Sequence, residues 1–168
     1  RNTSTSLQIS FAARVDIPVN SDVNNIILAD LNSDGKLDII GSTTNYTNTL
    51  ITLIKNLSTT GNIVFDNYFT MVANTNFTML AAGDFDMDGK IDLVGGCVNC
   101  AMGGGGGSYY LTIWAFRNTS TGGNISFAGN QQYYSPLLSG GSSTFLAKDL
   151  IVRDMDKDNK PDVVVGTE

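Results

Sequence analysis

Three short clusters of aspartates hold most of the acidic side chains of this sequence. Eleven of the sixteen acidic residues lie within positions 30–38, 84–92 and 154–162, and the others are Asp16, Asp22, Asp66, Asp149 and Glu168. All three clusters have the form Asp-x-Asp/Asn-x-Asp-Gly/Asn-Lys-x-Asp. Calcium is a hard cation that takes about six to eight oxygen ligands, many of them carboxylates. The chemistry indicated by these residues is therefore cation binding.

The spacing predicts which atoms would hold the ion. Side-chain oxygens at positions 1, 3, 5 and 9 and the backbone carbonyl at position 7 can surround one Ca²⁺ in a tight turn. The candidate ligands are Asp30, Asn32, Asp34, Lys36 and Asp38, then Asp84, Asp86, Asp88, Lys90 and Asp92, then Asp154, Asp156, Asp158, Lys160 and Asp162. Position 6 needs positive φ, which suits Gly35, Gly89 and, as the next best residue, Asn159. We expect three calcium ions, one per loop.

These loops differ from EF-hands in the segment on their C-terminal side. An EF-hand continues as a helix with a glutamate at position 12. Here position 12 is Gly41, Gly95 or Val165, and apolar, β-branched residues surround it. Magnesium prefers fewer protein ligands and more water, so calcium is the expected ion. An ion that offsets four clustered carboxylates has a structural role, and we expect no catalytic one.

Two elements repeat along the chain in the same order. The first aspartates of the loops are 54 and 70 residues apart. A second element reads RNTSTSLQISF at 1–11, KNLSTTGNIVF at 55–65 and RNTSTGGNISF at 117–127. Repeats of this length indicate an architecture built from similar supersecondary units.

Each unit contains short β-type segments separated by Gly, Asn and Ser clusters. The first strands are expected at Ile26–Ala29, Met79–Ala82 and Leu150–Val152, and the second at Leu37–Ile40, Ile91–Val94 and Val163–Val165. The third are expected at Leu50–Ile54 and Tyr110–Phe116, and the Ile-x-Phe element is interpreted as the fourth. Four antiparallel strands per repeat predict an all-β fold of β-propeller blades, with a sandwich or solenoid as alternatives.

The loop sequences DLNSDGKLDIIG, DFDMDGKIDLVG and DMDKDNKPDVVVG resemble FG-GAP/VCBS repeats, with VCBS the closer label because the Phe-Gly/Gly-Ala-Pro elements of integrin repeats are absent. The resemblance covers essentially the whole chain, residues 1–168, with units of about 1–54, 55–116 and 117–168. It implies a propeller of about seven blades, with calcium at the fifteen residues named above.

A closed propeller takes about four to eight blades. The chain is expected to supply two complete and two partial blades, as part of a longer protein or as a protomer completed by neighbouring copies. In the second case the N-terminal Ile-Ser-Phe segment would add as a strand to the last blade of the next copy, forming a ring or filament.

Composition excludes several classes of function. The net charge is −6, and it is concentrated in the three clusters, because the 10 basic and 5 acidic residues outside them leave +5. No nucleic-acid partner is expected, and there is no apolar run of about 18 residues for a membrane span. Without histidine, or an acid pair outside the loops, we expect no enzyme active site. Cys97 and Cys100 predict a small local disulfide, with free thiols as the alternative.

The expected function is that of an extracellular, secreted or cell-surface module for adhesion, recognition or structural assembly, with a protein or glycan ligand. Calcium loops and the glycosylation sequons at Asn2, Asn45, Asn56, Asn76, Asn118 and Asn124 favour that location. Two alternatives are a lectin and a non-catalytic part of a secreted polysaccharide-degrading enzyme. A lectin would stack sugars on Tyr109, Tyr110, Trp114, Tyr133 or Tyr134.

Overall fold

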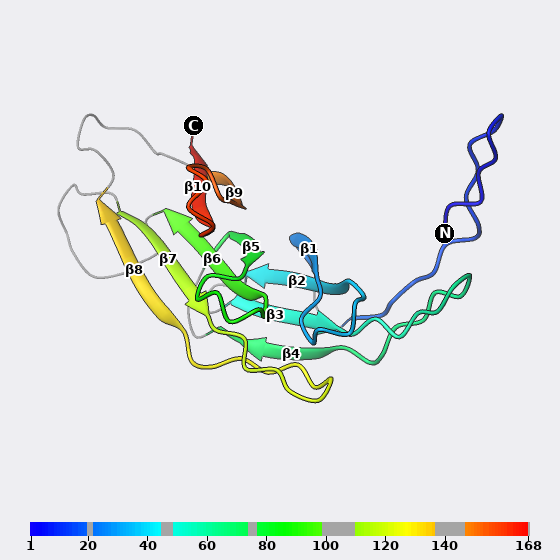
Figure 1. Cartoon of the computed structure of the whole chain (residues 1–168), viewed down its shortest axis with the longest axis horizontal. Coiled ribbons are helices and arrows are strands. Elements are labelled where there is room, and N and C mark those ends of the chain that lie inside the picture. Colours follow the sequence, from blue (N-terminus) through cyan, green and yellow to red (C-terminus); the bar gives the residue numbers. More distant parts are fainter. Residues whose placement is uncertain (20–21, 45–48, 74–76, 99–109, 137–146, 168) are drawn as a thin grey trace.

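The chain forms antiparallel β-sheets. A computed structural model describes residues 1–19, 22–44, 49–73, 77–98, 110–136 and 147–167, and these contain ten strands and no helix (Figure 1). The expectation of an all-β fold is therefore confirmed for the described residues.

Strands pair with their neighbours in sequence. The first sheet has the order β1 (Asn25–Ala29), β2 (Asp38–Thr44), β3 (Thr49–Ile54) and β4 (Phe69–Val72). The second has the order β5 (Met79–Gly83), β6 (Asp92–Val98), β7 (Tyr110–Phe116) and β8 (Gln131–Pro136). A third, two-stranded sheet pairs β9 (Ala147–Arg153) with β10 (Asp162–Thr167). The sheets are open, and an acidic loop joins the first two strands of each.

The first two strands of all three units and the third strands of the first two units lie where the sequence predicts them, but the fourth strands do not. The Ile-x-Phe element instead forms one side of a short hairpin, closed by the bridges Asn2–Phe11, Asn56–Phe65 and Asn118–Phe127. We call residues 1–12, 55–66 and 117–128 the first, second and third hairpins. The carbonyl of the middle residue of each element, Ser10, Val64 or Ser126, accepts an amide from the other side of its own hairpin, so the element is paired there and not with the sheet. The fourth strands β4 and β8 begin four residues after Phe65 and Phe127.

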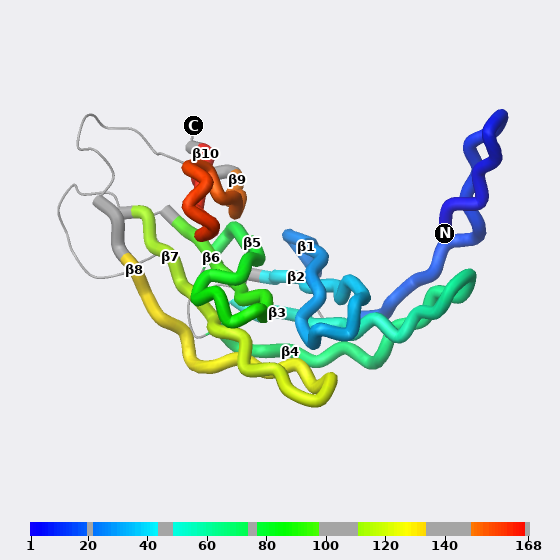
Figure 2. The backbone as a smooth tube through the Cα atoms, in the orientation of Figure 1, coloured from blue at the N-terminus to red at the C-terminus, as the bar shows by residue number. Residues whose placement is uncertain are grey.

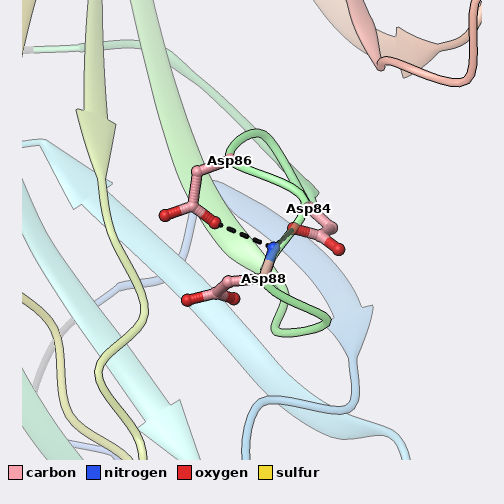
Figure 3. Close-up of side chains that lie close together, drawn as sticks. All are labelled: Asp84, Asp86 and Asp88. Carbon is pink, nitrogen blue, oxygen red and sulfur yellow. Dashed lines mark hydrogen bonds between the residues drawn. The ribbon is translucent and has the colours of Figure 1, made fainter.

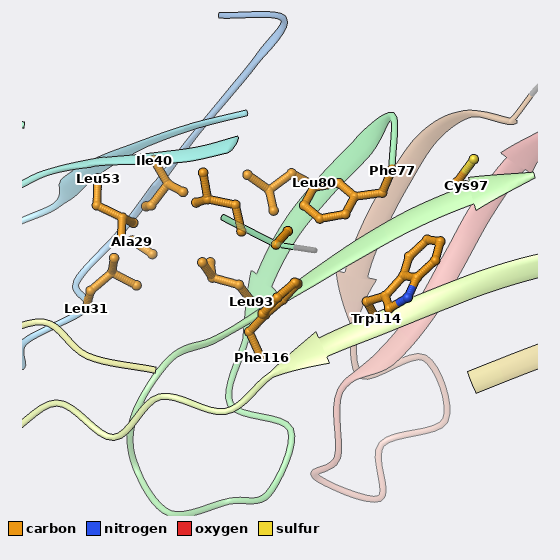
Figure 4. Packing of buried hydrophobic residues seen from close by; sticks show 12 residues of the cluster. Ala29, Leu31, Ile40, Leu53, Phe77, Leu80, Leu93, Cys97, Trp114 and Phe116 are labelled. Carbon is orange, nitrogen blue, oxygen red and sulfur yellow. The ribbon is translucent and has the colours of Figure 1, made fainter. Parts of the chain in front are cut away.

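The middle sheet buries both of its faces. Alternate residues of a strand point to opposite faces. Leu80, Leu93 and Trp114 belong to a core shared with the first sheet (Figure 4). Ala81 and Val94 belong to a second core, shared with Leu150 of the third sheet. This explains why the strands of the middle repeat are apolar almost throughout.

Glycine at position 12 of the second loop leaves room for Phe77, the largest fully buried side chain of the described residues. A Cβ on Gly95 would lie 2.5 Å from the Phe77 ring. Phe77 is fully buried and packs 6.3 Å from Trp114 and 6.0 Å from Phe116 between ring centroids. Only a residue without a side chain permits this packing between two sheets.

The first strands of successive sheets contact one another, β1 with β5 and β5 with β9. Figures 1 and 2 show these strands close together, while β4 and β8 lie farther out. The outward faces of the two end sheets are apolar and exposed, with Ile26 and Leu28 at one end and Ile151 and Val164 at the other.

Candidate metal centre

All three acidic loops share one backbone conformation. Position 6 has positive φ in each: 81° at Gly35, 85° at Gly89 and 70° at Asn159. This confirms the expectation for position 6, including the asparagine. Position 4 also has positive φ, between 58° and 67°, at Ser33, Met87 and Lys157. The sequence carries no signal for position 4, because none of these residue types favours the left-handed region.

Backbone N–H groups of each loop converge on its carboxylates. Asp84 accepts hydrogen bonds from the amides of Asp88 and Gly89, at 3.1 and 3.0 Å, and Asp86 accepts one from Asp88 (Figure 3). Asp88 accepts one from the amide of Lys90. The first loop repeats these bonds at Asp30, Asn32 and Asp34. The third loop repeats them at Asp154, Asp156 and Asp158, except that Asp154 accepts the amide of Lys157 at position 4 in place of the amide at position 5.

Carboxylates meet closely in two of the loops. One oxygen from each of Asp84, Asp86 and Asp88 lies within 4.8 Å of the others, and the same holds for Asp154, Asp156 and Asp162. Each set could hold a metal ion. A carboxylate has about four lone-pair sites, so accepting amide hydrogens leaves sites for a cation. Among the described residues the first loop has no such triple of acids; its position 3 is Asn32, which adds a neutral oxygen.

The aspartate at position 9 fastens each loop to the strand that begins there. Asp38 is fully buried, and its carboxylate accepts the amides of Leu31 at 3.1 Å and Asn56 at 2.8 Å. Asp92 likewise accepts the amides of Phe85 and Asn118. Asp162 accepts the amide of Met155.

Burial raises the pKa of the Asp38 and Asp92 carboxyls above the usual 3.8, against the lowering effect of these amide bonds. Neighbouring loop aspartates raise it further. A bound cation would favour the ionised form of both carboxyls by attraction. A cation bound in the first or second loop would therefore assist the ionisation of Asp38 or Asp92.

Arg117 supplies a positive charge to the second loop. Its guanidinium pairs with Asp86 and, at 3.1 Å, with Asp88, and the hydrogen bond from Arg117 lowers the pKa of Asp86. The pair is exposed, so it stabilises the fold little. Its equivalent in the first unit, Lys55, reaches elsewhere: its ammonium donates to the Gly123 carbonyl of the third hairpin at 2.8 Å. The repeated hairpin sequence shows that Arg117 and Lys55 are equivalent, but it does not predict which groups either side chain contacts.

Asn118 joins two units. Its side-chain amide donates to the carbonyls of Ile91 in the second loop, at 2.8 Å, and Leu31 in the first loop, at 2.9 Å. Asn118 is buried and its amide nitrogen is engaged, so this sequon is not accessible in the folded chain. Local sequence patterns gave no signal for the structural role of this asparagine.

Several other candidate residues have structural positions. Trp114 is buried in the core, so the hypothesis that it stacks sugars is wrong; the alternation along β7 directs it toward the first sheet. Tyr133 is exposed. The side chains of Tyr110 and Tyr134, and all of Tyr109, lie outside the described part of the chain. Cys97 is disulfide-bonded, and the only other cysteine of the sequence is Cys100.

Comparisons with protein-family models, with curated proteins and with solved structures found no match to this chain. In the described residues, no helix is present that is long and apolar enough to cross a membrane.

Proposed function

We propose that this chain is a calcium-stabilised module of β-propeller type, similar to FG-GAP/VCBS repeats. It serves adhesion, recognition or structural assembly in an extracellular or cell-surface protein and has no catalytic activity. The observation that carries the proposal is that three loops, far apart in sequence, share the same turn and the same hydrogen bond from the position-6 amide to the position-1 aspartate.

The stacking of the sheets supports the propeller assignment. In a propeller, four-stranded blades surround an axis and each blade packs on the next. Here the second sheet packs on the first through one face and on the third through the other. The first strands β1, β5 and β9 are in contact in that order, as the strands nearest the axis of a propeller would be.

The donor set supports a structural cation site. In each loop the oxygens at positions 1, 3, 5 and 9 and the carbonyl at position 7 would hold the ion, which would offset the repulsion between clustered carboxylates. Because loop amides already orient positions 1, 3 and 5, little rearrangement is needed to present their oxygens. The ion would connect the end of the first strand to the start of the second.

Calcium titration by isothermal calorimetry tests the proposal. The wild-type chain is expected to bind three Ca²⁺, and the variant Asp86→Asn/Asp88→Asn only two, because its second loop loses two negative charges. A matched control is Asp66→Asn, an exposed aspartate outside the loops, which should keep three. Absence of calcium binding by the wild type, or equal losses in both variants, would refute the proposal.

A further inference from the structure

The third hairpin packs on the first acidic loop. We call the surface that it contacts there, around Leu31, Asn32 and Lys55, the first seat. Asn118 donates to the Leu31 carbonyl at 2.9 Å, and Lys55 donates to the Gly123 carbonyl at 2.8 Å. Ile125 and Phe127 pack against the core of the first two sheets. Leu31 is consequently only 1% exposed, whereas its equivalent in the third loop, Met155, is 65% exposed.

The second unit contains an equivalent seat without a hairpin on it. A cavity of about 370 Å³ lies beside the second loop, and its lining includes Phe85, Asp86, Arg117 and Gly129. The pairing of β5 with β6 matches that of β1 with β2, which makes Phe85 equivalent to Leu31 and Asp86 equivalent to Asn32. The repeated hairpin sequence makes Arg117 equivalent to Lys55. These are the positions that contact the third hairpin in the first unit. Within the described residues, no hairpin fills this second seat.

The first hairpin, in contrast, does not pack on an acidic loop in this structure. It projects from the body of the molecule, as Figure 2 shows for the N-terminal residues. Ile9 is 82% and Phe11 71% exposed, although their equivalents in the third hairpin, Ile125 and Phe127, pack against the core. A hydrogen bond from Arg1 to the Gly61 carbonyl, at 2.8 Å, holds the first hairpin beside the second. Lys55 holds the second beside the third in the same way.

The exposed outer faces of the first and third sheets are equivalent to faces that pack against each other between neighbouring sheets inside this chain. Leu80 and Ala82, equivalent to the exposed Ile26 and Leu28, pack in the core shared with the preceding sheet. The opposite face of the third sheet exposes Ile151 and Val164. Exposed apolar faces that match a buried contact elsewhere in the same molecule can pair between copies.

We propose that copies of this chain associate head to tail, with the first hairpin of one copy in the empty seat of another. Asn2 would donate to the Phe85 carbonyl as Asn118 does to that of Leu31, and Arg117 would turn toward the incoming hairpin as Lys55 does. The face with Ile26 and Leu28 would then cover the one with Ile151 and Val164. The first-hairpin end of one copy contacts the second-seat end of another, so the contact is heterologous and propagates or closes into a ring.

This mode differs from the strand addition expected from the sequence. In this structure residues 1–12 are paired with each other in a hairpin, for example through the bond from the Thr3 amide to the Ser10 carbonyl, so the Ile-Ser-Phe segment is not a single unpaired strand. This association rests on the proposed function, in which structural assembly is one of the roles of the chain. Its contacts do not include a metal ion. Measuring it with calcium and with EGTA separates its failure from a failure of the calcium proposal.

Two full-length variants test the association by sedimentation velocity. Ile9→Ser/Phe11→Ser alters exposed side chains of the hairpin. Gly129→Arg fills the seat, and a Cβ at Gly129 has no atom within 4 Å and needs no positive φ, so the variant should fold. Circular dichroism verifies folding of both. Each variant carries one intact half of the contact and therefore serves as the control for the other.

The wild type is expected to form dimers and longer species as its concentration rises, while each variant alone sediments as a monomer. An equimolar mixture of the variants should form a one-to-one dimer and nothing longer, because only one hairpin–seat contact is possible. A monomeric wild type at every concentration, or a monomeric mixture, would overturn the proposal. Association that survives in both single variants would overturn it in favour of strand pairing at β10.

Discussion

Asp38 shows how one aspartate can serve both the fold and a cation site. Both of its oxygens accept backbone amides, one from the acidic loop and one from the second hairpin. The residue is thus already part of the folded framework before any ion is considered. Its buried carboxylate is also the type of ligand that a calcium ion takes. Asp34, at position 5 of the same loop, is by contrast exposed and therefore more readily available to an ion.

Replacing Asp38 should therefore destabilise the chain even without calcium. In EGTA, Asp38→Ala leaves the amides of Leu31 and Asn56 without acceptors, which is expected to lower the free energy of unfolding by about 2–4 kcal/mol. Asp34→Ala, at an exposed position of the same loop, should cost less than about 1 kcal/mol. Urea unfolding measures both, and hydrogen exchange should accelerate at the amides of Leu31 and Asn56. Equal effects of the two variants would contradict this account of position 9.

At the scale of elements, the hairpins connect neighbouring units. Asn56 and Asn118 form a matched pair, because both bond to the position-9 aspartate, to a loop carbonyl and to a serine two residues on. Only Asn118 has a further bond to the preceding unit, at the Leu31 carbonyl. The difference between the two asparagines therefore isolates the contact between units.

Asn118→Ala should accordingly cost more stability than Asn56→Ala. The additional buried hydrogen bond predicts a difference of about 1–3 kcal/mol in the free energy of unfolding, measured by denaturant titration of both variants. A similar loss in both would mean that the bond to Leu31 contributes nothing, and would weaken the case for the equivalent seat in the second unit.

The elements differ in how far the sequence predicts them. The loops and the first three strands of each unit can be predicted from local patterns, namely the aspartate spacing and the apolar runs beside it. The fourth strands escape such a prediction because the more apolar Ile-x-Phe element lies just before them. The seat on the first loop could not be predicted, since it depends on Asn118 and Leu31, which are 87 residues apart in sequence. Likewise the positive φ of Met87 has no signal in its residue type.

At the scale of the whole molecule, the structure is a short stack of sheets with unlike ends. The middle sheet is covered on both faces, whereas the outer faces of the first and third sheets expose apolar side chains. Each acidic loop joins the first two strands of its sheet, so an ion bound there would stabilise every layer of the stack. Calcium would then act on the unfolding of the whole molecule.

The thermal unfolding of the chain in EGTA, with Ca²⁺ and then with Mg²⁺, tests this central claim most directly. A site that binds only in the folded state adds about 2.7 kcal/mol when the free ion is at a hundredfold its dissociation constant. Three such loops predict a large rise in melting temperature with Ca²⁺ and a much smaller one with Mg²⁺. An unchanged melting temperature in Ca²⁺, or an equal rise with Mg²⁺, would contradict the assignment of the acidic loops as calcium sites.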